Sequence, residues 1–237
     1  MSPTLSITKR ELGAYFNTPI GYVFIIFFLL LTCYLYIQKL FMTNVADMRE
    51  YFGSLTFMFL FFIPAISMRL WAEERKLGTL ELLMTMPIKT WQAVLGKYLA
   101  GLVVVALMLT LTLHIPLVLG LLGNPDPGPI IGGYLGAMVL GMVYLAIGAF
   151  ASSLTSDQIV AFIIAIFINF MFWLLGYAAM WVKDFSVTVA NIIERFGVDY
   201  HFESIARGVV DTRDIIYAVT ISGLFLLLNI LIIERRR

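Results

Sequence analysis

The sequence predicts an all-α membrane protein with six transmembrane helices. Of its 237 residues, 61% are hydrophobic and 13% are charged, against roughly a quarter charged in an average soluble domain. Its uncharged stretches have about the 17 to 25 residues that a helix needs to cross a bilayer. They are apolar on every face, unlike the alternating strands of a membrane barrel, which favours helices. These stretches cover residues 20–37, 52–68, 98–122, 130–153, 159–182 and 215–233.

The distribution of lysine and arginine predicts the orientation. Cytoplasmic loops carry an excess of these residues, and the two sets of alternate loops contain ten and six of them. The ten lie on the side of both termini, so we expect both termini in the cytoplasm. The net charge of +1 gives no indication of nucleic-acid binding. The ten are Lys9, Arg10, Arg69, Arg75, Lys76, Lys89, Lys97, Arg235, Arg236 and Arg237.

Residues 1–19 predict a short amphipathic helix in the inner membrane interface. Thr8 and Glu11 have the spacing of a capping box, and residues 17–19 end the helix before the first span. A disordered tail is the alternative. The apolar side chains that share roughly one helical face are Leu5, Leu12, Tyr15 and Phe16.

Residues 72–89 form a charged segment between the second and third spans. Charged residues 73–76 extend the second helix beyond the bilayer, Gly78 permits a sharp turn, and Thr79 can cap a new short helix that Pro87 ends. A helix lying across the tip of such a hairpin can fit a groove on a soluble partner. The alternative is a solvated loop that caps two helices.

The loop at residues 183–213, before the last span, predicts two short helices. Apolar residues recur at helical spacing within 187–196 and again within 202–210. We expect their apolar faces to dip back toward the outer leaflet, where such segments persist only when they pack on protein.

The spans contain few groups that carry chemistry. The six uncharged stretches contain no Asp, Glu, Lys or Arg, which disfavours an ion-coupled secondary transporter. Apart from tyrosines, their ionisable groups are Cys33 and His114. His114 precedes Pro116, whose missing N–H frees a carbonyl one turn earlier, so a structural histidine is favoured over a ligand. Cys33 is expected to be a small buried hydrophobe.

The sequence contains no pattern of a catalytic or metal site. It has no His/Cys pair at ligand spacing and no phosphate-binding loop, since Gly96-Lys97 lacks both the preceding glycine and the following serine or threonine hydroxyl. We therefore expect no enzyme activity and no cofactor in this chain, and any ATP that it uses is bound by another chain.

Three segments resemble one family. Residues 73–83 (EERKLGTLELL), followed by Pro87 and Gly96-Lys97, look like the coupling-helix region of ABC-2 type transporter permeases. Residues 9–23 are similar to the N-terminal interfacial helix of the gliding-motility-associated branch of that family. Residues 201–217 resemble the segment before the last span in the same branch.

The resemblance implies the permease subunit of an ABC exporter in the bacterial cytoplasmic (inner) membrane. It implies a transmembrane domain over residues 20–237, pairing with itself or with a related permease, and two cytoplasmic ATPase subunits that bind ATP and Mg²⁺ on separate chains. The alternative is a mechanotransmission subunit that acts on periplasmic or envelope partners without moving a substrate.

The resemblance also assigns roles to individual residues. The interfacial helix, with Lys9, Arg10, Glu11, Tyr15 and Phe16, and the coupling helix touch the ATPase; on the latter the contact candidates are Glu73, Glu74, Gly78, Thr79, Glu81 and Pro87. The second and fifth spans line the export path, with Phe57, Phe61, Phe162 and Phe170 as lining candidates and simple packing as the alternative. His201, Glu203 and Arg207 belong either to an outer re-entrant hairpin at the exit or to local hydrogen bonds that hold this hairpin closed.

Overall fold

The computed structural model describes residues 2–43, 47–85, 87–123, 125–183, 186–206 and 211–235. Every regular element within these ranges is an α-helix. The helices are α1 (Pro3–Phe16), α2 (Pro19–Thr43), α3 (Arg49–Ser67), α4 (Arg69–Lys76), α5 (Thr79–Thr85), α6 (Thr90–Leu111), α7 (His114–Leu122), α8 (Pro127–Leu154), α9 (Gln158–Val182), α10 (Val187–Phe196), α11 (Val198–Ala206) and α12 (Thr212–Glu234).

Six helical segments in the described ranges are long and apolar enough to cross a membrane, as the sequence predicts. The second is formed by α3 and α4 in series and the third by α6 and α7, while single helices form the others. The segments are Gly21–Met42, Arg49–Lys76, Thr90–Leu122, Pro127–Leu154, Gln158–Ala179 and Thr212–Glu234.

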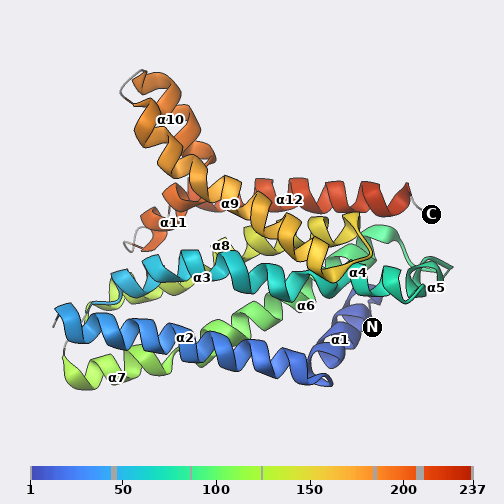
Figure 1. Cartoon of the computed structure of the whole chain (residues 1–237), viewed down its shortest axis with the longest axis horizontal. Helices are drawn as coiled ribbons and strands as arrows, with labels where there is room; N and C mark the ends of the chain where they lie inside the picture. Colours follow the sequence, from blue (N-terminus) through green and yellow to red (C-terminus); the bar gives the residue numbers. More distant parts are fainter. Residues whose placement is uncertain are drawn as a thin grey trace.

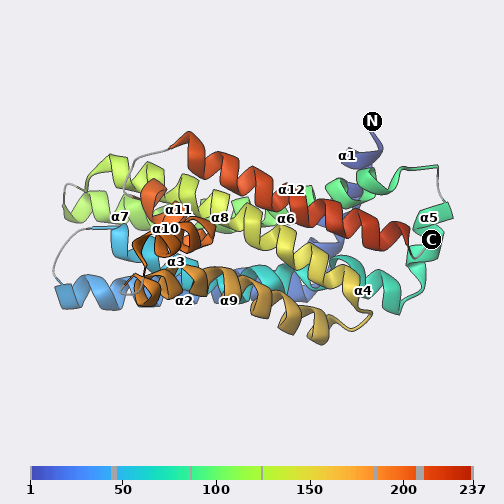
Figure 2. The same ribbon diagram turned by 90° about the horizontal axis from the view of Figure 1, so that it is seen from above.

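The long helices lie side by side around α8, which packs against α3, α6, α9 and α12 (Figures 1 and 2). Both termini and α5 lie at one end of this bundle, which we call the terminal end (Figure 1). Helices α7, α10 and α11 lie at the opposite end, and α10 with the adjoining part of α9 projects sideways from the bundle. Helix α1 crosses steeply beside α6.

Glycines let α3 and α8 approach closely. A Cβ atom added at Gly133 would lie 2.1 Å from the ring of Phe52, and one at Gly148 would lie 1.9 Å from Ser67 Oγ. Such distances are far below van der Waals contact, so these positions accept only glycine at this helix spacing. The close packing fixes how α3 and α8 sit relative to each other.

The third span bends where Pro116 interrupts its hydrogen bonds. The Thr112 carbonyl, which has no N–H to accept from at Pro116, accepts instead from the Tyr134 hydroxyl (3.0 Å). His114 Nδ1 donates to the Leu111 carbonyl (2.7 Å). His114 thus makes a structural contact, but the prediction that it satisfies the carbonyl freed by Pro116 was wrong, because Tyr134 occupies that carbonyl. Cys33 is only half-buried, and its thiol lies 3.2 Å from His114 Nε2, so the expectation of a buried cysteine was wrong.

The N-terminal helix begins earlier than the capping-box pattern predicted. Helix α1 starts at Pro3, with Ser2 as its N-cap residue, because proline at the first helical position loses no hydrogen bond. Thr8 therefore lies inside the helix, where its hydroxyl is 3.0 Å from the carbonyls of both Thr4 and Gly96. The capping box at Thr8 was a wrong interpretation, and this hydroxyl instead joins α1 to α6.

Candidate functional site

The predicted contact segments meet at the terminal end. Helix α4 ends at Lys76, and Gly78 turns the chain in the left-handed region, with φ of 69°, which glycine adopts without strain. The seven-residue α5 follows. Helix α6 then begins at Thr90, where the Lys89 N–H donates to Gln92 Oε1 (3.0 Å). The charged segment is thus a helical hairpin with α5 at its tip.

Four charged side chains from three helices form a compact cluster behind this hairpin. Lys97 Nζ on α6 lies 2.9 Å from Glu11 Oε1 on α1 and 3.1 Å from Glu74 Oε1 on α4. Arg10 Nη2 lies 2.8 Å from Glu11 and 2.7 Å from Glu74. Two cations and two carboxylates balance, so the charge cluster (Arg10, Glu11, Glu74 and Lys97) ties α1, α4 and α6 together without a net charge.

Lys97 is the centre of the charge cluster. Its side chain is 1% exposed, and its ammonium lies 5.0 Å from the ring centroid of Trp71, a cation–π distance. A buried ammonium is stable only when it is paired and hydrogen-bonded. This role of Lys97 is not evident from the sequence, because Lys97 directly precedes the uncharged run 98–122 and resembles a cation at a membrane boundary.

The charge cluster shifts the pKa values on α1. Burial acts to raise the pKa of the Glu11 carboxyl, but Lys97 and Arg10 outweigh it and bring this pKa below its usual value. Burial acts to lower the pKa of the Arg10 guanidinium, but its hydrogen bond to Glu11 and the nearby carboxylates raise this pKa overall. Both residues therefore stay charged at neutral pH.

Ser152, near the end of α8, holds the junction between α3 and α4. Its hydroxyl donates to the Met68 carbonyl (2.7 Å) and accepts from the N–H groups of Trp71 (3.0 Å) and Ala72 (3.1 Å). The hydroxyl thus replaces hydrogen bonds of a continuous helix, and such an inserted side chain is a known cause of helix breaks. Arg75 adds a bond to the Ser153 carbonyl (2.9 Å), so α8 is also fixed to α4.

Tyr15 and Arg69 connect the base of α1 to the same junction. The Tyr15 hydroxyl donates to the Ile66 carbonyl, and the guanidinium of Arg69 lies 5.1 Å from the Tyr15 ring centroid. Arg69 Nε also pairs with Glu73 Oε2 at 3.0 Å. Since Tyr15 is buried, its pKa lies above its usual value, and the hydroxyl remains a donor at physiological pH.

The outer face of the hairpin tip is exposed and partly apolar. Leu77 is 69% exposed and Leu82 is 65% exposed, whereas Leu83 packs inward against the core. Glu81 and Thr85 are also exposed. Leu77 lies at the end of α4, and Leu82 and Glu81 lie on α5, which is anchored by the buried Leu83. Exposed apolar side chains beside a carboxylate have the composition of a protein-binding surface.

The six contact candidates on the hairpin separate into two groups. Gly78, Thr79, Glu81 and Pro87 are exposed at the tip, and the Thr79 hydroxyl donates to the Glu74 carbonyl (3.3 Å). Glu74 instead points inward to the charge cluster, and Glu73 pairs with Arg69. On α1, Lys9 is exposed, while the ring of Phe16 packs edge-on against Tyr22 at 5.9 Å.

A family model described as ABC-2 family transporter protein matches residues 14–232. The chain belongs to the ABC-2 transporter family. Members are the membrane components of ABC transporters and typically pair with ATPase subunits, so this ABC-2 chain is a multi-pass permease component. The comparison with curated proteins gives no match. The match does not separate the branches of the family, and the gliding-motility branch stays a prediction.

An aromatic ladder joins the second and fifth spans of this ABC-2 chain. Phe57 contacts Phe61 (5.3 Å between ring centroids) and Trp173 (6.3 Å), and Trp173 stacks on Phe170 (5.5 Å) and contacts Tyr177 (4.6 Å). A cavity of about 400 Å³ adjoins the ladder toward the opposite end, between Phe57, Trp173 and the charged residues Arg49 and Asp199. Three of the four lining candidates are thus connected, Phe57 and Phe61 directly and Phe170 through Trp173, whereas Phe162 makes none of these ring contacts.

His201 holds the loop before the last span of the ABC-2 chain. Its Nδ1 lies 2.6 Å from Asp214 Oδ1 on α12, and its Nε2 lies 3.0 Å from the Arg195 carbonyl on α10. Its ring stacks on Tyr217, whose hydroxyl donates to the Phe196 carbonyl (2.7 Å). These contacts join α10, α11 and α12. Arg207 and the side chain of Glu203 lie outside the described residues.

Proposed function

We propose that the chain is the permease subunit of an ABC-2 exporter in the bacterial cytoplasmic membrane, with the terminal end in the cytoplasm. The excess of lysine and arginine on that side supports this orientation. ATP and Mg²⁺ bind to separate ATPase subunits, and these dock on the tip of the α4–α5 hairpin. The chain pairs with a second permease subunit, either a copy of itself or a related chain.

The observation that carries the proposal is the exposed face of α5 on a rigid support. Glu81 and Leu82 on α5 are exposed, as is Leu77 at the end of α4. Behind them, the charge cluster fixes the hairpin to α1 and α6, and Ser152 fixes it to α8. A displacement of α5 by a closing ATPase is therefore transmitted to several helices at once, because they cannot move separately without breaking buried polar contacts.

The aromatic ladder is the proposed wall of the substrate path. Phe57 and Phe61 are about half exposed on α3, and Trp173 and Phe170 extend the same surface along α9. Exposed aromatic rings between two spans offer large apolar area for contact with a moving substrate or with the paired subunit. Phe162 lies near the start of α9, closer to the terminal end of the bundle, and is a separate candidate on the same path.

Mechanotransmission without export is the second candidate function, and α10 is the observation that favours it. This helix projects sideways at the opposite end (Figure 1), and it exposes Val189, Ile192 and Phe196 at helical spacing. Such a face suits an envelope partner that is moved by the subunit. A transport measurement in reconstituted vesicles distinguishes the two functions. Export requires that a substrate crosses the bilayer, whereas mechanotransmission does not.

Charge reversal at Glu81 tests the docking proposal. Glu81→Lys places a cation in the middle of the exposed α5 face without touching a buried contact, so we expect membrane insertion to persist and co-purification of the ATPase to be lost. Glu50→Lys is the matched control, because Glu50 is an exposed glutamate at the opposite end. Normal co-purification and ATP turnover in Glu81→Lys would remove α5 from the docking surface.

A further inference from the structure

A cavity of about 110 Å³ lies where the corner between α1 and α2 meets the break between α3 and α4. Its floor is apolar and buried, and is made of Ile25, Ala65, Ile66, Val104 and Met108. Its volume approaches that of engineered cavities of about 150 Å³ that take up benzene. The floor therefore accepts a few methylene groups or one ring, and excludes a large solute.

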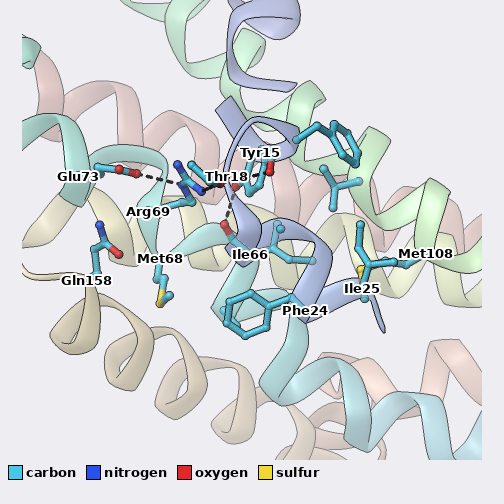
Figure 3. A pocket seen from close by; sticks show the side chains of 14 residues that line it. Tyr15, Thr18, Phe24, Ile25, Ile66, Met68, Arg69, Glu73, Met108 and Gln158 are labelled. Carbon is cyan, nitrogen blue, oxygen red and sulfur yellow. Dashed lines mark hydrogen bonds and ion pairs between the residues drawn. The ribbon is translucent and has the colours of Figure 1, made fainter. Parts of the chain in front are cut away.

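The rim of this corner cavity is polar and zwitterionic. Figure 3 shows Arg69 between Glu73 and Thr18, with Phe24, Ile25 and Met108 on the far side of the pocket. Arg69 uses Nε toward Glu73 Oε2 (3.0 Å) and Nη1 toward Thr18 Oγ1 (3.3 Å). Among the described residues, Arg69 Nη2 and Glu73 Oε1 have no hydrogen-bond partner. One cationic donor and one anionic acceptor thus remain side by side at the mouth.

The corner cavity lies at the depth of a phospholipid headgroup. Its rim residue Arg69 is the first charged residue after the uncharged run 52–68, and Thr18 directly precedes Pro19, where α2 begins. Gln158 on the same rim is the first residue of α9. The rim therefore lies where three spans leave the hydrocarbon core, and the floor lies one to two turns further into the bilayer.

We propose that the corner cavity binds one phospholipid whose zwitterionic headgroup carries a primary ammonium, such as phosphatidylethanolamine. The phosphate accepts from Arg69 Nη2, the ammonium donates to Glu73 Oε1, and the first methylenes of one acyl chain cover the apolar floor. Because the rim pair has no net charge, it does not select an anionic lipid. A quaternary ammonium has no N–H to donate, so phosphatidylcholine makes only the phosphate contact.

Native mass spectrometry of the full chain in detergent tests the proposal without any ATPase. Three lipids with identical acyl chains are titrated: phosphatidylethanolamine, phosphatidylcholine and phosphatidylglycerol. A charge-assisted hydrogen bond is worth roughly tenfold in affinity or more, so phosphatidylethanolamine is expected to bind about tenfold more tightly than either of the other two. Equal binding of the three lipids, or tighter binding of phosphatidylglycerol, would overturn the assignment.

Variants locate the binding site. Glu73→Gln keeps the shape of a side chain that is 37% exposed, and it is expected to remove the preference over phosphatidylcholine while binding of phosphatidylcholine itself persists. Ala65→Leu fills the floor and is expected to weaken binding of all three lipids. Glu50→Gln, at the opposite end of the same span, is the control that keeps the preference. A preference that survives in Glu73→Gln, or binding that survives in Ala65→Leu, contradicts the site.

Discussion

The charge cluster shows at the residue scale why four charges can be placed against an apolar bundle. Each carboxylate contacts both cations within 3.1 Å, and the four formal charges sum to zero. Removing one member leaves a buried group with an uncompensated charge, which costs more than the intact cluster contributes. The charge cluster therefore holds α1, α4 and α6 in one arrangement, and it contributes to the stability of the bundle only when all four members are present.

Lys97→Met tests this charge balance. Without the ammonium, Arg10 alone faces the two carboxylates of Glu11 and Glu74, so we expect a loss on the order of 3 kcal/mol in unfolding free energy, seen as a lower thermal midpoint in detergent. The double variant Lys97→Met with Glu74→Gln restores equal numbers of charges and is expected to be more stable than the single variant. If the second substitution lowers the midpoint further, charge balance is not what stabilises this site.

The lowered pKa of Glu11 predicts that α1 detaches in acid. A carboxyl whose folded pKa is depressed contributes stability above its unfolded pKa, near 4.3, and this contribution is lost as pH falls through the folded pKa. A spin label at the exposed Ser6 should therefore stay immobile from about pH 8 to pH 5 and gain mobility only in stronger acid. Glu11→Gln should reduce this transition, and mobility that already rises between neutral pH and pH 5 would contradict the assignment.

At the scale of helices, the break between α3 and α4 depends on one hydroxyl from a distant part of the chain. Ser152 reaches the break because Gly148, one turn earlier on α8, allows contact with Ser67. Without the hydroxyl, the N–H groups of Trp71 and Ala72 have either no acceptor or the carbonyls of a straightened helix. The angle between α3 and α4 is thus set by α8 as well as by the local sequence.

Ser152→Ala is expected to straighten the junction or to destabilise the bundle. Two buried N–H groups without an acceptor cost roughly 1–3 kcal/mol each, and a continuous helix avoids this cost. The distance between spin labels at Ser54 on α3 and Lys76 on α4 should therefore change relative to the wild type. Ser156→Ala, in the exposed loop that follows α8, is the matched control. An unchanged distance together with unchanged thermal stability would show that the hydroxyl does not hold the break.

The sequence predicted elements well and contacts between them poorly. Hydropathy located all six spans, because length and composition alone decide whether a segment dissolves in lipid. The start of α1 was misplaced at Thr8, since a capping-box spacing also occurs inside a helix when Pro3 can begin it earlier. Lys97 and Ser152 were missed as anchors, because their partners belong to other helices: Glu11 lies 86 residues from Lys97 and Met68 lies 84 residues from Ser152. No local periodicity indicates such pairs.

At the scale of the whole molecule, the terminal end behaves as one connected body. Helix α1 rests on α6 at Gly96, where an added Cβ would lie 2.9 Å from Ile7 and 3.0 Å from the Thr4 carbonyl. The charge cluster joins this pair to α4, and Ser152 joins α4 to α8. We expect a displacement of α5 to reach the opposite end of the bundle through these contacts. Each contact is buried or partly buried, so breaking it has a free-energy cost.

Gly96→Leu tests whether this connection transmits motion. The leucine side chain cannot fit between α1 and α6, so α1 should lift away while the exposed face of α5 is unchanged. In a reconstituted complex of two permease subunits with the ATPase, each subunit carries a spin label at Thr188 on α10. The distance between the two labels reports how far apart the α10 helices of the two subunits lie. ATP is expected to change that distance in the wild type and to change it less in Gly96→Leu, although the ATPase still co-purifies.

Gly120→Leu is the matched control, because an added Cβ there meets nothing within 4 Å. An ATP response in Gly96→Leu equal to that of the control would show that motion bypasses α1, and that the contacts of α4 with α8 suffice to move the bundle.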